Sequence, residues 1–357
     1  MKTVLILRGD GIGPEVTEQG VKVLRVMAAE AAIEVEVEEA LIGAAALDAA
    51  GVALPEQTLA RAGAADAILF GAVGDPRYDR ADFYLQPGKG LLRLRRELEL
   101  YANLRPVKAF SAALQASPLK AERIEGVDLM IVRELTGGIY FGEPRGIKEE
   151  AGERYALNTM IYTEREVERI VRFAFELARK RRRKLTSVDK GNALEVGRFW
   201  RDTAARIARE YADVETHHLY VDNAAMQIIR EPAQFDTLVM GNMFGDILSD
   251  AAANLVGSLG MLPSASIGRH HALYEPCHGS APDIAGRDIA NPIASILSVG
   301  MLFGYSFDRP EVEATVHRAV NDVLARYRTA DIMEAGKTQV GCTQMGDLIA
   351  ERLQRAG

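Results

Sequence analysis

Short apolar runs alternate with amphipathic segments along the first third of the chain. Residues 3–7 form an apolar run that predicts a buried strand, and a glycine-rich turn follows it. Pro14 stands where a helix can begin, because the first turn of a helix does not need the missing N–H group. Further strands are predicted at 33–40 and 67–70, and a helix at 54–62. Strands that alternate with helices predict an α/β fold.

The middle of the chain continues this alternation, except for one long stretch without a helical period. Helices are predicted at 91–100, 164–183 and 194–211, and strands at 127–134, 185–189, 215–221 and 237–241. Residues 136–163 contain several glycines, a proline and scattered aromatic residues, so we predict a protruding hairpin there. Such a protrusion is expected to pack on another surface, and a second copy of the chain is the simplest candidate. No flexible linker is visible, so a division into domains requires the chain to cross over and return.

Composition places the chain among ordinary globular proteins, with 357 residues of which 48% are hydrophobic and 26% charged. The formal net charge of -7 argues against nucleic acid and anionic membranes as partners, and the basic run at 180–184 fits a helix C-terminus. No apolar run is long enough to span a membrane, and the N-terminus lacks the features of a signal peptide. Cys277 and Cys342 have no metal-ligand spacing, which is typical of free thiols in the reducing cytoplasm.

Two aspartates give the strongest local signal for chemistry. Asp246 and Asp250 are four residues apart in the segment GNMFGDILSD, where a helix projects both carboxylates from one face. Like charges at this spacing repel, so a cation stabilises the pair, and ligands that are all oxygen favour Mg²⁺ or Mn²⁺ over zinc. Asp222 in YVDNAAMQ is the best candidate for a third ligand. The alternative is that Asp250 is simply exposed and Asp246 caps the helix.

Three arginines are candidates for binding a carboxylate substrate. Arg95, Arg105 and Arg133 lie beside apolar runs, and a guanidinium group binds a carboxylate through paired hydrogen bonds. Each of them could instead be a surface arginine. Lys190 follows an apolar strand and could act as a base, and Tyr140 could return a proton to a carbanion. Taken alone, a lysine or tyrosine in such a position is more often structural.

Two loops are candidates for binding a nucleotide. The glycine-rich turn at 9–13 is a weak signal for a phosphate site, could equally be a tight turn, and is not the G-x-G-x-x-G fingerprint of a Rossmann fold. The loop at 278–291 is more informative, because small residues keep its backbone open and Asp283 can accept hydrogen bonds from ribose hydroxyls. A carboxylate there repels a 2′-phosphate, which favours NAD over NADP.

Nine segments of the chain, taken in order, carry a resemblance to a known family. They are GDGIGPEV, LLRLRREL, ANLRP, VRELTGGIYFGEPRG, SVDKGNALEV, YVDNAAMQ, GNMFGDILSDAAA, GSLGMLPSAS and HGSAPDIAGRDIANPIA. Over residues 3–350 the chain resembles the isocitrate/isopropylmalate dehydrogenase family of β-decarboxylating dehydrogenases. The resemblance implies two α/β domains around a large mixed sheet rather than a Rossmann fold. It assigns residues 1–100 and 257–357 to a first, cofactor-side domain and residues 101–256 to a second, whose arm at 136–163 joins a homodimer.

The resemblance also implies a role for each candidate residue. Arg95, Arg105 and Arg133 would bind the carboxylates of a malate, and Tyr140 and Lys190 would be the proton-transfer pair. Asp246 and Asp250 of one subunit would hold Mg²⁺ or Mn²⁺ together with Asp222 of the partner subunit. The partner subunit would also supply Lys190, and its Asp222 would lie beside the substrate. The loops at 71–84 and 279–291 match the loops that bind NAD, and His278 would line the adenine side. The cofactor-binding candidates are Ile12, Gly71, Gly74, His278, Gly279, Ser280, Ala281, Asp283, Ile284 and Asn291.

The implied reaction is the oxidation and decarboxylation of a 2-hydroxy diacid, and the motifs are most similar to those of members that act on 3-isopropylmalate in leucine biosynthesis. Leu91 and Leu92 would form an apolar wall for the isopropyl group. Gly88 and Ala193 replace a glutamate and a valine that are usual in such members, and Asp75 replaces a glycine. These changes suggest a roomier pocket, so D-malate, tartrate, homoisocitrate or another 3-alkylmalate are alternative substrates. A catalytically idle homologue is a further alternative.

Overall fold

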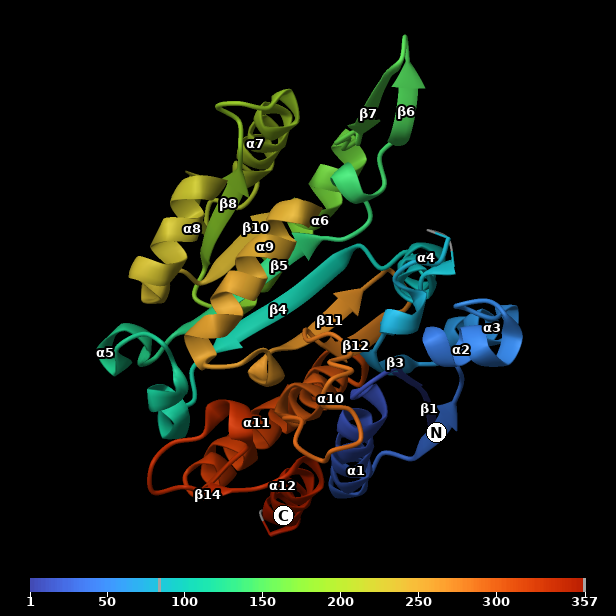
Figure 1. The fold of residues 1–357 in the computed structure, drawn as a ribbon. Helices are drawn as coiled ribbons and strands as arrows, with labels where there is room; N and C mark the ends of the chain where they lie inside the picture. Colours follow the sequence, from blue (N-terminus) through green and yellow to red (C-terminus); the bar gives the residue numbers. More distant parts are fainter. Residues whose placement is uncertain (83–84, 356–357) are drawn as a thin grey trace. The chain divides into compact units, whose positions relative to one another are not determined.

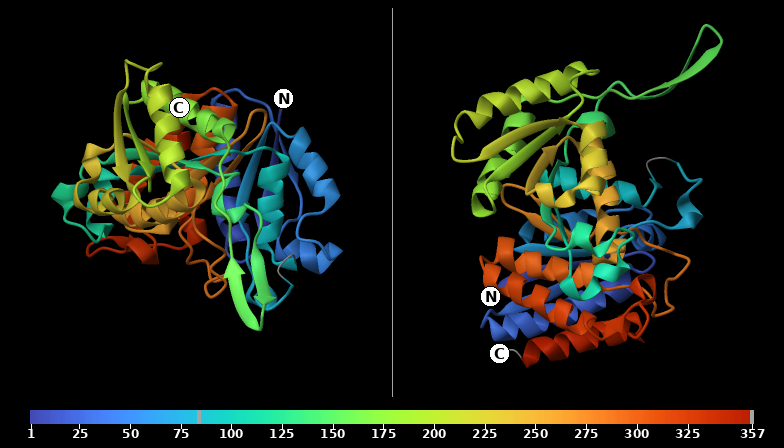
Figure 2. Two further views of the ribbon diagram at one scale, coloured as in Figure 1. Left: turned by 90° about the horizontal axis from the view of Figure 1, so that it is seen from above. Right: turned by 90° about the vertical axis from the view of Figure 1, so that its left-hand side faces the viewer.

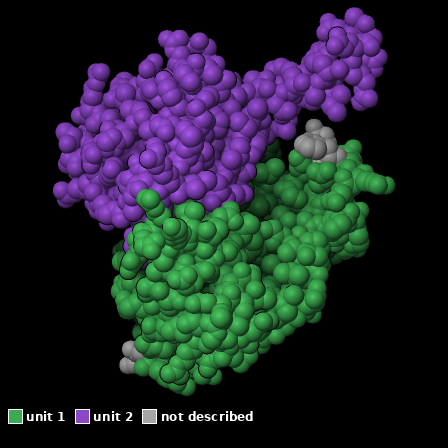
Figure 3. Space-filling view, turned by 60° about the vertical axis from the view of Figure 1, so that its left-hand side comes forward, with its two compact units in different colours: residues 1–100, 109–125, 253–357 green, residues 101–108, 126–252 purple. Residues whose placement is uncertain are grey.

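The computed structural model describes residues 1–82 and 85–355, and the chain divides into two units, coloured separately in Figure 3. Unit 1 comprises residues 1–100, 109–125 and 253–357, and unit 2 comprises residues 101–108 and 126–252. The chain therefore leaves unit 1 and returns to it, as the absence of a linker predicts.

The predicted domain boundaries differ from these units at two places. Residues 109–125 are predicted in the second domain, with the return at residue 257, whereas the structure assigns 109–125 to unit 1 and begins the return at residue 253. The segment belongs to unit 1 because Phe110 stacks on His317 and Arg328 donates a hydrogen bond to the carbonyl of Ala112. Residues 83–84 of the predicted cofactor loop and residues 356–357 of the predicted first domain lie outside the described residues.

The strands of unit 1 follow the order β2-β1-β3-β12-β11. They are β1 (Lys2–Gly9), β2 (Val35–Glu39), β3 (Ala67–Ala72), β11 (Pro263–Ile267) and β12 (Ala272–Pro276). The pairs of β1 with β2, β1 with β3 and β3 with β12 are parallel, and β11 runs antiparallel to β12. This order with its antiparallel strand is not that of a Rossmann fold.

Helices cover both faces of this sheet (Figure 1). On one face, α1 (Gly13–Glu30), α10 (Ile293–Ser306), α11 (Pro310–Leu324) and α12 (Cys342–Gln354) pack against one another. On the other face lie α2 (Ala44–Ala50), α3 (Glu56–Ala64) and α4 (Gly88–Glu97), where Leu5 and Leu7 of β1 join a buried cluster with Leu94 and Leu98. Alternate residues of a strand point to opposite faces, so β1 contributes to two cores.

Unit 1 also contains several short elements. These are η1 (Pro76–Tyr78), η3 (Ser111–Ala116), α5 (Ala121–Ile124), η6 (Asn254–Val256), η7 (Leu259–Met261), β13 (Tyr327–Arg328), η8 (Ala330–Ile332) and β14 (Thr338–Gln339). Among the described residues, no helix has the length and apolar character that crossing a membrane requires.

The strands of unit 2 follow the order β4-β5-β10-β8-β9. They are β4 (Ala102–Lys108), β5 (Asp128–Glu134), β8 (Lys184–Asp189), β9 (Glu215–Tyr220) and β10 (Thr237–Met240). All neighbours are parallel except β4, which runs antiparallel to β5. The sequence pattern does not predict β4, because Arg105 and Pro106 interrupt its apolar run.

The helices of unit 2 are α6 (Glu164–Lys180), α7 (Glu195–Ala208), α8 (Val221–Arg230) and α9 (Asn242–Ala253), with the short η4 (Gly138–Tyr140) and η5 (Pro232–Gln234). Helix α6 packs on β5, β8 and β10, and it begins with a capping box in which Thr163 and Glu166 bond to each other's backbone. It ends at Lys180, before the predicted residue 183, because Lys184 already begins β8.

The predicted hairpin is present, although it occupies only part of the predicted range. It consists of β6 (Gly146–Glu150) and β7 (Glu153–Leu157), joined by Ala151 and Gly152, which both have positive φ angles as a two-residue hairpin turn requires. The hairpin extends away from the rest of unit 2 (Figure 2). Its strands are exposed, with Ile147 at 71% and Tyr155 at 40% of full exposure.

Candidate active site

The candidate residues of unit 2 lie at the carboxyl ends of its parallel strands. Arg133 lies at the end of β5, Lys190 follows β8, Asp222 follows β9, and α9 with its two aspartates follows β10. The register aligns these ends, because Met240 of β10 pairs with both Arg133 and Val188. In open α/β sheets this edge is where ligands bind.

Both predicted metal-binding aspartates of α9 contact cationic or hydroxyl groups in unit 2. Oδ1 of Asp246 forms an ion pair with Arg133, and its Oδ2 accepts a hydrogen bond from the hydroxyl of Tyr140 at 3.0 Å. Oδ1 of Asp250 accepts a hydrogen bond from Nη1 of Arg105 at 2.9 Å. Because α9 begins at Asn242, Asp246 lies inside the helix, and the alternative that it caps the helix is wrong. The other part of that alternative agrees with the structure, because the Asp250 side chain is 55% exposed.

None of the three predicted arginines is a surface residue. The side chains of Arg105 and Arg133 are 9% and 5% exposed, and the ring of Tyr140 lies 5.9 Å from the guanidinium carbon of Arg133. In unit 1, Arg95 on α4 is 12% exposed and forms an ion pair of 2.7 Å with the buried Glu275. Buried guanidinium groups held by carboxylates form preorganised sites for further anions.

Burial and the local charges shift two pKa values in this cluster. Burial raises the pKa of Tyr140, and the negative charge of Asp246 raises it further, so the phenol stays protonated and able to donate. Burial also raises the pKa of Asp250, with a further contribution from Asp246, while the charge of Arg105 opposes the shift. Arg105 and Arg133 therefore offset the repulsion between the two aspartates, and burial keeps the pKa of Asp250 raised.

Lys190 and Asp222 form a second group in unit 2. Nζ of Lys190 donates a hydrogen bond of 2.8 Å to Asp222, and this bond holds the pKa of the aspartate below its usual range. Asp222 lies in the first turn of α8 rather than at the strand end predicted for it. Within residues 1–82 and 85–355, neither side chain forms a hydrogen bond with Asp246, Asp250 or Tyr140.

The predicted cofactor residues of unit 1 come together from three segments of the chain. These segments follow β1, β3 and β12 at the carboxyl edge of the sheet. The backbone N–H of Ile12 donates to the carbonyl of Ser280 at 2.8 Å, and the Ile12 side chain packs with Ala281 and Ile284. Gly71 lies against the turn at Gly13, and Gly74 lies against the side chain of Ser280.

Close packing explains the glycine-rich turn at 9–13. Gly11 has a φ of +57°, and a Cβ at this position would lie 2.0 Å from the carbonyl oxygen of Ser280. Asp10, which the sequence analysis does not single out, holds the turn because its carboxylate accepts hydrogen bonds from the backbone of Ala44, Ala45 and Gly74. Of the two open interpretations, the structure supports the tight turn.

The loop at 278–291 contains one buried side-chain nitrogen that has no hydrogen-bond partner among the described residues. Nδ1 of His278 bonds to the carbonyl of Gly279, whereas its buried Nε2 has no partner among the described residues, and burial lowers the pKa of the imidazole. Asp283 and Gly279 are exposed. Asn291 is buried, where its Oδ1 accepts from the backbone of Ile293 and its Nδ2 donates to Asp331.

Helix α4 carries the residues predicted to contact the variable part of the substrate. It begins at Gly88, three residues before the predicted start, and places Leu91 and Leu92 one turn before Arg95. Leu91 also packs against the buried core of unit 1. A Cβ at Gly88 would meet no atom of residues 1–82 or 85–355 within 4 Å.

Other departures from the family pattern have local contacts of their own. Asp75 accepts hydrogen bonds from the backbone and side chain of Arg77 and caps η1. Ala193 lies in the exposed turn that follows Lys190, and its backbone N–H donates to the carbonyl of that lysine.

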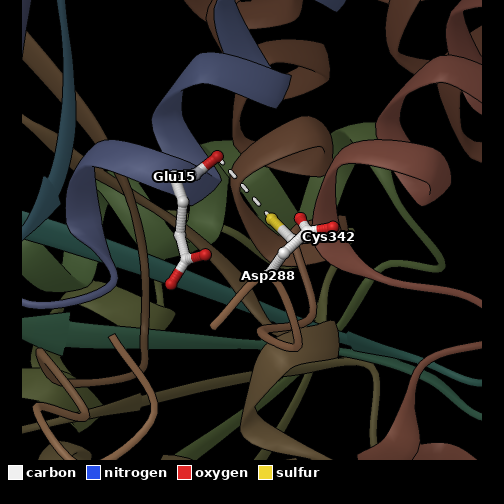
Figure 4. A group of neighbouring side chains, drawn as sticks. All are labelled: Glu15, Asp288 and Cys342. Atoms are coloured by element: carbon white, nitrogen blue, oxygen red, sulfur yellow. Dashed lines mark hydrogen bonds between the residues drawn. The ribbon is translucent and has the colours of Figure 1, made fainter. Parts of the chain in front are cut away.

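Glu15, Asp288 and Cys342 in unit 1 are close enough to hold a metal ion, although the sequence analysis does not predict a site there (Figure 4). Their bonds are satisfied within the protein: the Cys342 thiol donates to the carbonyl of Glu15, and Asp288 accepts from the backbone and hydroxyl of Thr343. Burial raises the pKa of Cys342 to about 12, and a metal binds the thiolate. The group is therefore better explained as packing between the loop and α12.

Alkylation tests this interpretation of Cys342. At about pH 8 a thiol with this pKa is ionised in about one molecule in ten thousand, so native Cys342 should resist iodoacetamide. Mass spectrometry of native and urea-unfolded protein measures the modification. Rapid alkylation of the native thiol, or tight Zn²⁺ binding lost in Cys342→Ser, contradicts the packing role.

Comparison with known proteins is consistent with this geometry. A family model described as isocitrate/isopropylmalate dehydrogenase matches residues 3–349. Proteins named 3-isopropylmalate dehydrogenase from Aquifex aeolicus and Chromohalobacter salexigens are each 55% identical to this chain. The matches cover 99% of this chain, with 97% of the Aquifex protein and 99% of the Chromohalobacter protein. The chain belongs to the isocitrate/isopropylmalate dehydrogenase family.

Solved structures agree on the fold. The crystal structure of isocitrate dehydrogenase from Methylococcus capsulatus is 35% identical, with a TM-score of 0.88 over 99% of this chain and 100% of that chain. The structure of a β-decarboxylating dehydrogenase from Thermococcus kodakarensis is 32% identical, with a TM-score of 0.80 over 99% and 97% of the two chains. The predicted fold class is thereby confirmed.

Proposed function

We propose that this member of the family catalyses the NAD-linked oxidation and decarboxylation of 3-isopropylmalate to 4-methyl-2-oxopentanoate and CO₂, a step of leucine biosynthesis. The observation that carries the proposal is the convergence of Arg105, Arg133 and Tyr140 on Asp246 and Asp250. The relatives named 3-isopropylmalate dehydrogenase support the substrate, since they are 55% identical, against 35% for the structure of an isocitrate dehydrogenase.

The donor set of α9 fits a hard divalent cation, Mg²⁺ or Mn²⁺. Asp246 and Asp250 offer carboxylate oxygens one helical turn apart. Burial is the largest cause of the raised pKa of Asp250, and the charge of Asp246 adds a smaller contribution. We assign the third carboxylate to the partner subunit's Asp222, because Asp222 of this chain is 60% exposed and bonded to Lys190 rather than to the pair. When bound, such a cation lowers the pKa of a substrate hydroxyl and stabilises negative charge on its oxygen.

The other side chains of the proposed site bind the substrate and transfer protons. Arg105 and Arg133, with Arg95 from α4, bind the substrate carboxylates through charge-assisted hydrogen bonds. Lys190 would accept the proton of the hydroxyl group, and NAD held by the loops of unit 1 would supply the hydride acceptor. Tyr140 is protonated near neutral pH, as an ordinary phenol is, and its raised pKa keeps it protonated at higher pH. It would deliver a proton to the carbon from which CO₂ leaves.

We assign NAD to the loops of unit 1. The buried, unpartnered Nε2 of His278 fits the edge of an adenine ring, which offers both donors and acceptors. The exposed Asp283 fits the ribose hydroxyls and disfavours a 2′-phosphate. Asn291 already accepts a hydrogen bond from the first backbone N–H of α10, so it would support the loop rather than bind the cofactor directly.

We further propose a homodimer in which each site combines residues of both subunits. We place it in the cytoplasm, where thiols stay reduced, because neither cysteine forms a disulfide among the described residues. The exposed arm and the exposed apolar side chains of unit 2 support this assembly, because burying apolar surface in a subunit interface is stabilising, whereas leaving it in water is not. These side chains are Ile147, Tyr155, Ile161, Leu194, Phe199, Met226, Ile229 and Ile247.

A substrate panel with NAD and NADP, with and without a chelator, tests the proposed function. We expect cation-dependent NAD reduction with 3-isopropylmalate as the preferred substrate. A preference for isocitrate would refute the leucine-pathway assignment. Another 3-alkylmalate or D-malate is the second candidate, favoured by the open space at Gly88, while an idle homologue would reduce no NAD at all.

Gly88→Glu should narrow the substrate range. Gly88 is the first residue of α4 and has open space around it, so a glutamate side chain fits and places its charge favourably at the helix N-terminus. We expect the ratio of kcat/KM for 3-isopropylmalate over D-malate to rise about tenfold, within the 1–3 kcal/mol that such contacts supply. Gly88→Ala is the matched control, because it removes the helix glycine without adding the long side chain. An equal ratio in all three proteins counts against a substrate contact at this position.

A further inference from the structure

One buried amide connects the arginine and the tyrosine of the proposed site. Asn242 begins α9 just after β10 and is 1% exposed. Its Oδ1 accepts hydrogen bonds from Nε of Arg133 at 2.9 Å and from Nη2 at 2.8 Å. Its Nδ2 donates to the carbonyl oxygens of Leu135 and Gly137, both at 3.1 Å. The amide thus uses both of its acceptor positions and both of its donor hydrogens.

The chemistry of these partners allows only one orientation of the amide. A guanidinium group only donates and a carbonyl group only accepts, so exchanging Oδ1 and Nδ2 would break all four bonds. With its Nε and Nη2 held by Asn242, Arg133 presents Nη1 to Asp246. Gly245 completes this arrangement, because a Cβ there would lie 2.5 Å from Cγ of Arg133. The position of Arg133 is therefore set by α9.

The same amide holds the segment that leads to Tyr140. Residues 135–137 directly precede η4, whose last residue is Tyr140. Asn242 bonds to the carbonyl groups of this segment, while the buried carboxylate of Glu134 accepts the backbone N–H of Gly137 at 2.7 Å. Hydrogen bonds thus hold both the backbone carbonyl groups and a backbone N–H group of this segment.

We propose that Asn242 is a positioning residue for the reaction, which sets the orientation of Arg133 and the location of Tyr140 together; this inference rests on the proposed function. It touches neither substrate nor cofactor and acts through these two side chains. Because Arg133 binds substrate and Tyr140 transfers a proton, loss of the amide should raise KM and lower kcat. A displacement of about 1 Å of a reacting group can cost about a hundredfold in rate.

Asp236 provides a matched control at the opposite end of β10. It is also 1% exposed, and its carboxylate accepts hydrogen bonds of 2.9 Å from Nε of Arg181 and from the backbone of Arg182. Asn242→Ala and Asp236→Ala each remove a buried polar side chain that is bonded to an arginine. Both should lower the melting temperature, but only Asn242→Ala should change KM and kcat, each by about tenfold or more. If Asn242→Ala does not fold, Asn242→Ser takes its place.

The Arg133→Ala background separates positioning from a general structural effect. If Asn242 acts on binding through Arg133, the double variant Arg133→Ala with Asn242→Ala should have a KM within about threefold of that of Arg133→Ala alone. A further tenfold increase in KM would overturn the proposed path. Unchanged KM and kcat in Asn242→Ala, in a protein whose wild type oxidises 3-isopropylmalate, would overturn the inference while leaving the proposed function intact.

A measurement without substrate tests the geometry even if the proposed function fails. In the wild type, the Nε–H of Arg133 is buried in its bond to Asn242, so NMR should find slow exchange of its proton with water. We expect exchange at least about tenfold faster in Asn242→Ala and unchanged in Asp236→Ala. Equal acceleration in both variants would show a loss of stability rather than of positioning, and would overturn the inference.

Discussion

Asp246→Asn is expected to lower kcat/KM for 3-isopropylmalate about a thousandfold or more. Asp246 contacts Arg133 and Tyr140 and lies one turn from Asp250, so its charge serves the cation, the arginine and the proton donor together. Asparagine keeps the shape of the side chain and removes one unit of negative charge. Initial rates over a range of Mg²⁺ concentrations measure the loss, and EDTA should inactivate the wild type to a similar level.

Asp322→Asn is the control for this substitution. Asp322 on α11 forms an exposed ion pair with Arg352, so the same chemical change there should leave kcat/KM unchanged and cost at most about 1 kcal/mol of stability. Calorimetry of Mg²⁺ binding with substrate present provides a second measure, in which Asp246→Asn should show weaker binding. Full turnover by Asp246→Asn, or insensitivity of the wild type to EDTA, would remove the basis of the proposed mechanism.

The sequence predicts the parts of the fold that depend on local pattern. Apolar periods identify most of the strands and helices up to residue 241, and the glycines and the proline of 136–163 indicate the hairpin that β6 and β7 form. The strands and helices of unit 1 that follow residue 253 are not predicted. The spacing of Asp246 and Asp250 correctly places both carboxylates on one helix. The roles of the arginines come from the resemblance, and their burial is seen only in the structure.

What the sequence misses depends on contacts between distant residues. Strand β4 is not predicted because Arg105 counts as a polar residue in the pattern. In the structure Arg105 is buried, and it donates hydrogen bonds to Asn103, Ser249 and Asp250. Asn242 resembles any polar residue at a helix start until Leu135 and Gly137 are seen beside it. Asp10 is similar, since its partners Ala44 and Gly74 are far along the chain. An aspartate inside a glycine-rich turn was the available signal for it.

Mixing two inactive variants should restore activity if the proposed sites are shared between subunits. Lys190 is bonded to Asp222 and is separate from the Asp246 group within the described chain, so we expect it to act in the site of the partner subunit. Asp246→Asn and Lys190→Ala should each reduce activity about a thousandfold as pure dimers. In a mixed dimer, one site contains both defects and the other contains neither. Random reassociation makes half of the dimers mixed, so activity should recover to about a quarter of the wild type.

The control for this experiment is a pair of variants whose defects lie in the same group. Asp246→Asn and Asp250→Asn both alter α9, so every site in their mixed dimer keeps one defect and no activity should return. Rates measured after unfolding and refolding of equal mixtures, beside each variant refolded alone, separate the two cases. If the first mixture stays as inactive as the second while native mass spectrometry confirms mixed dimers, each site draws all its residues from one chain. In that case Lys190 and Asp222 of the same subunit must move to reach Asp246, and the proposed division of the site between subunits is wrong.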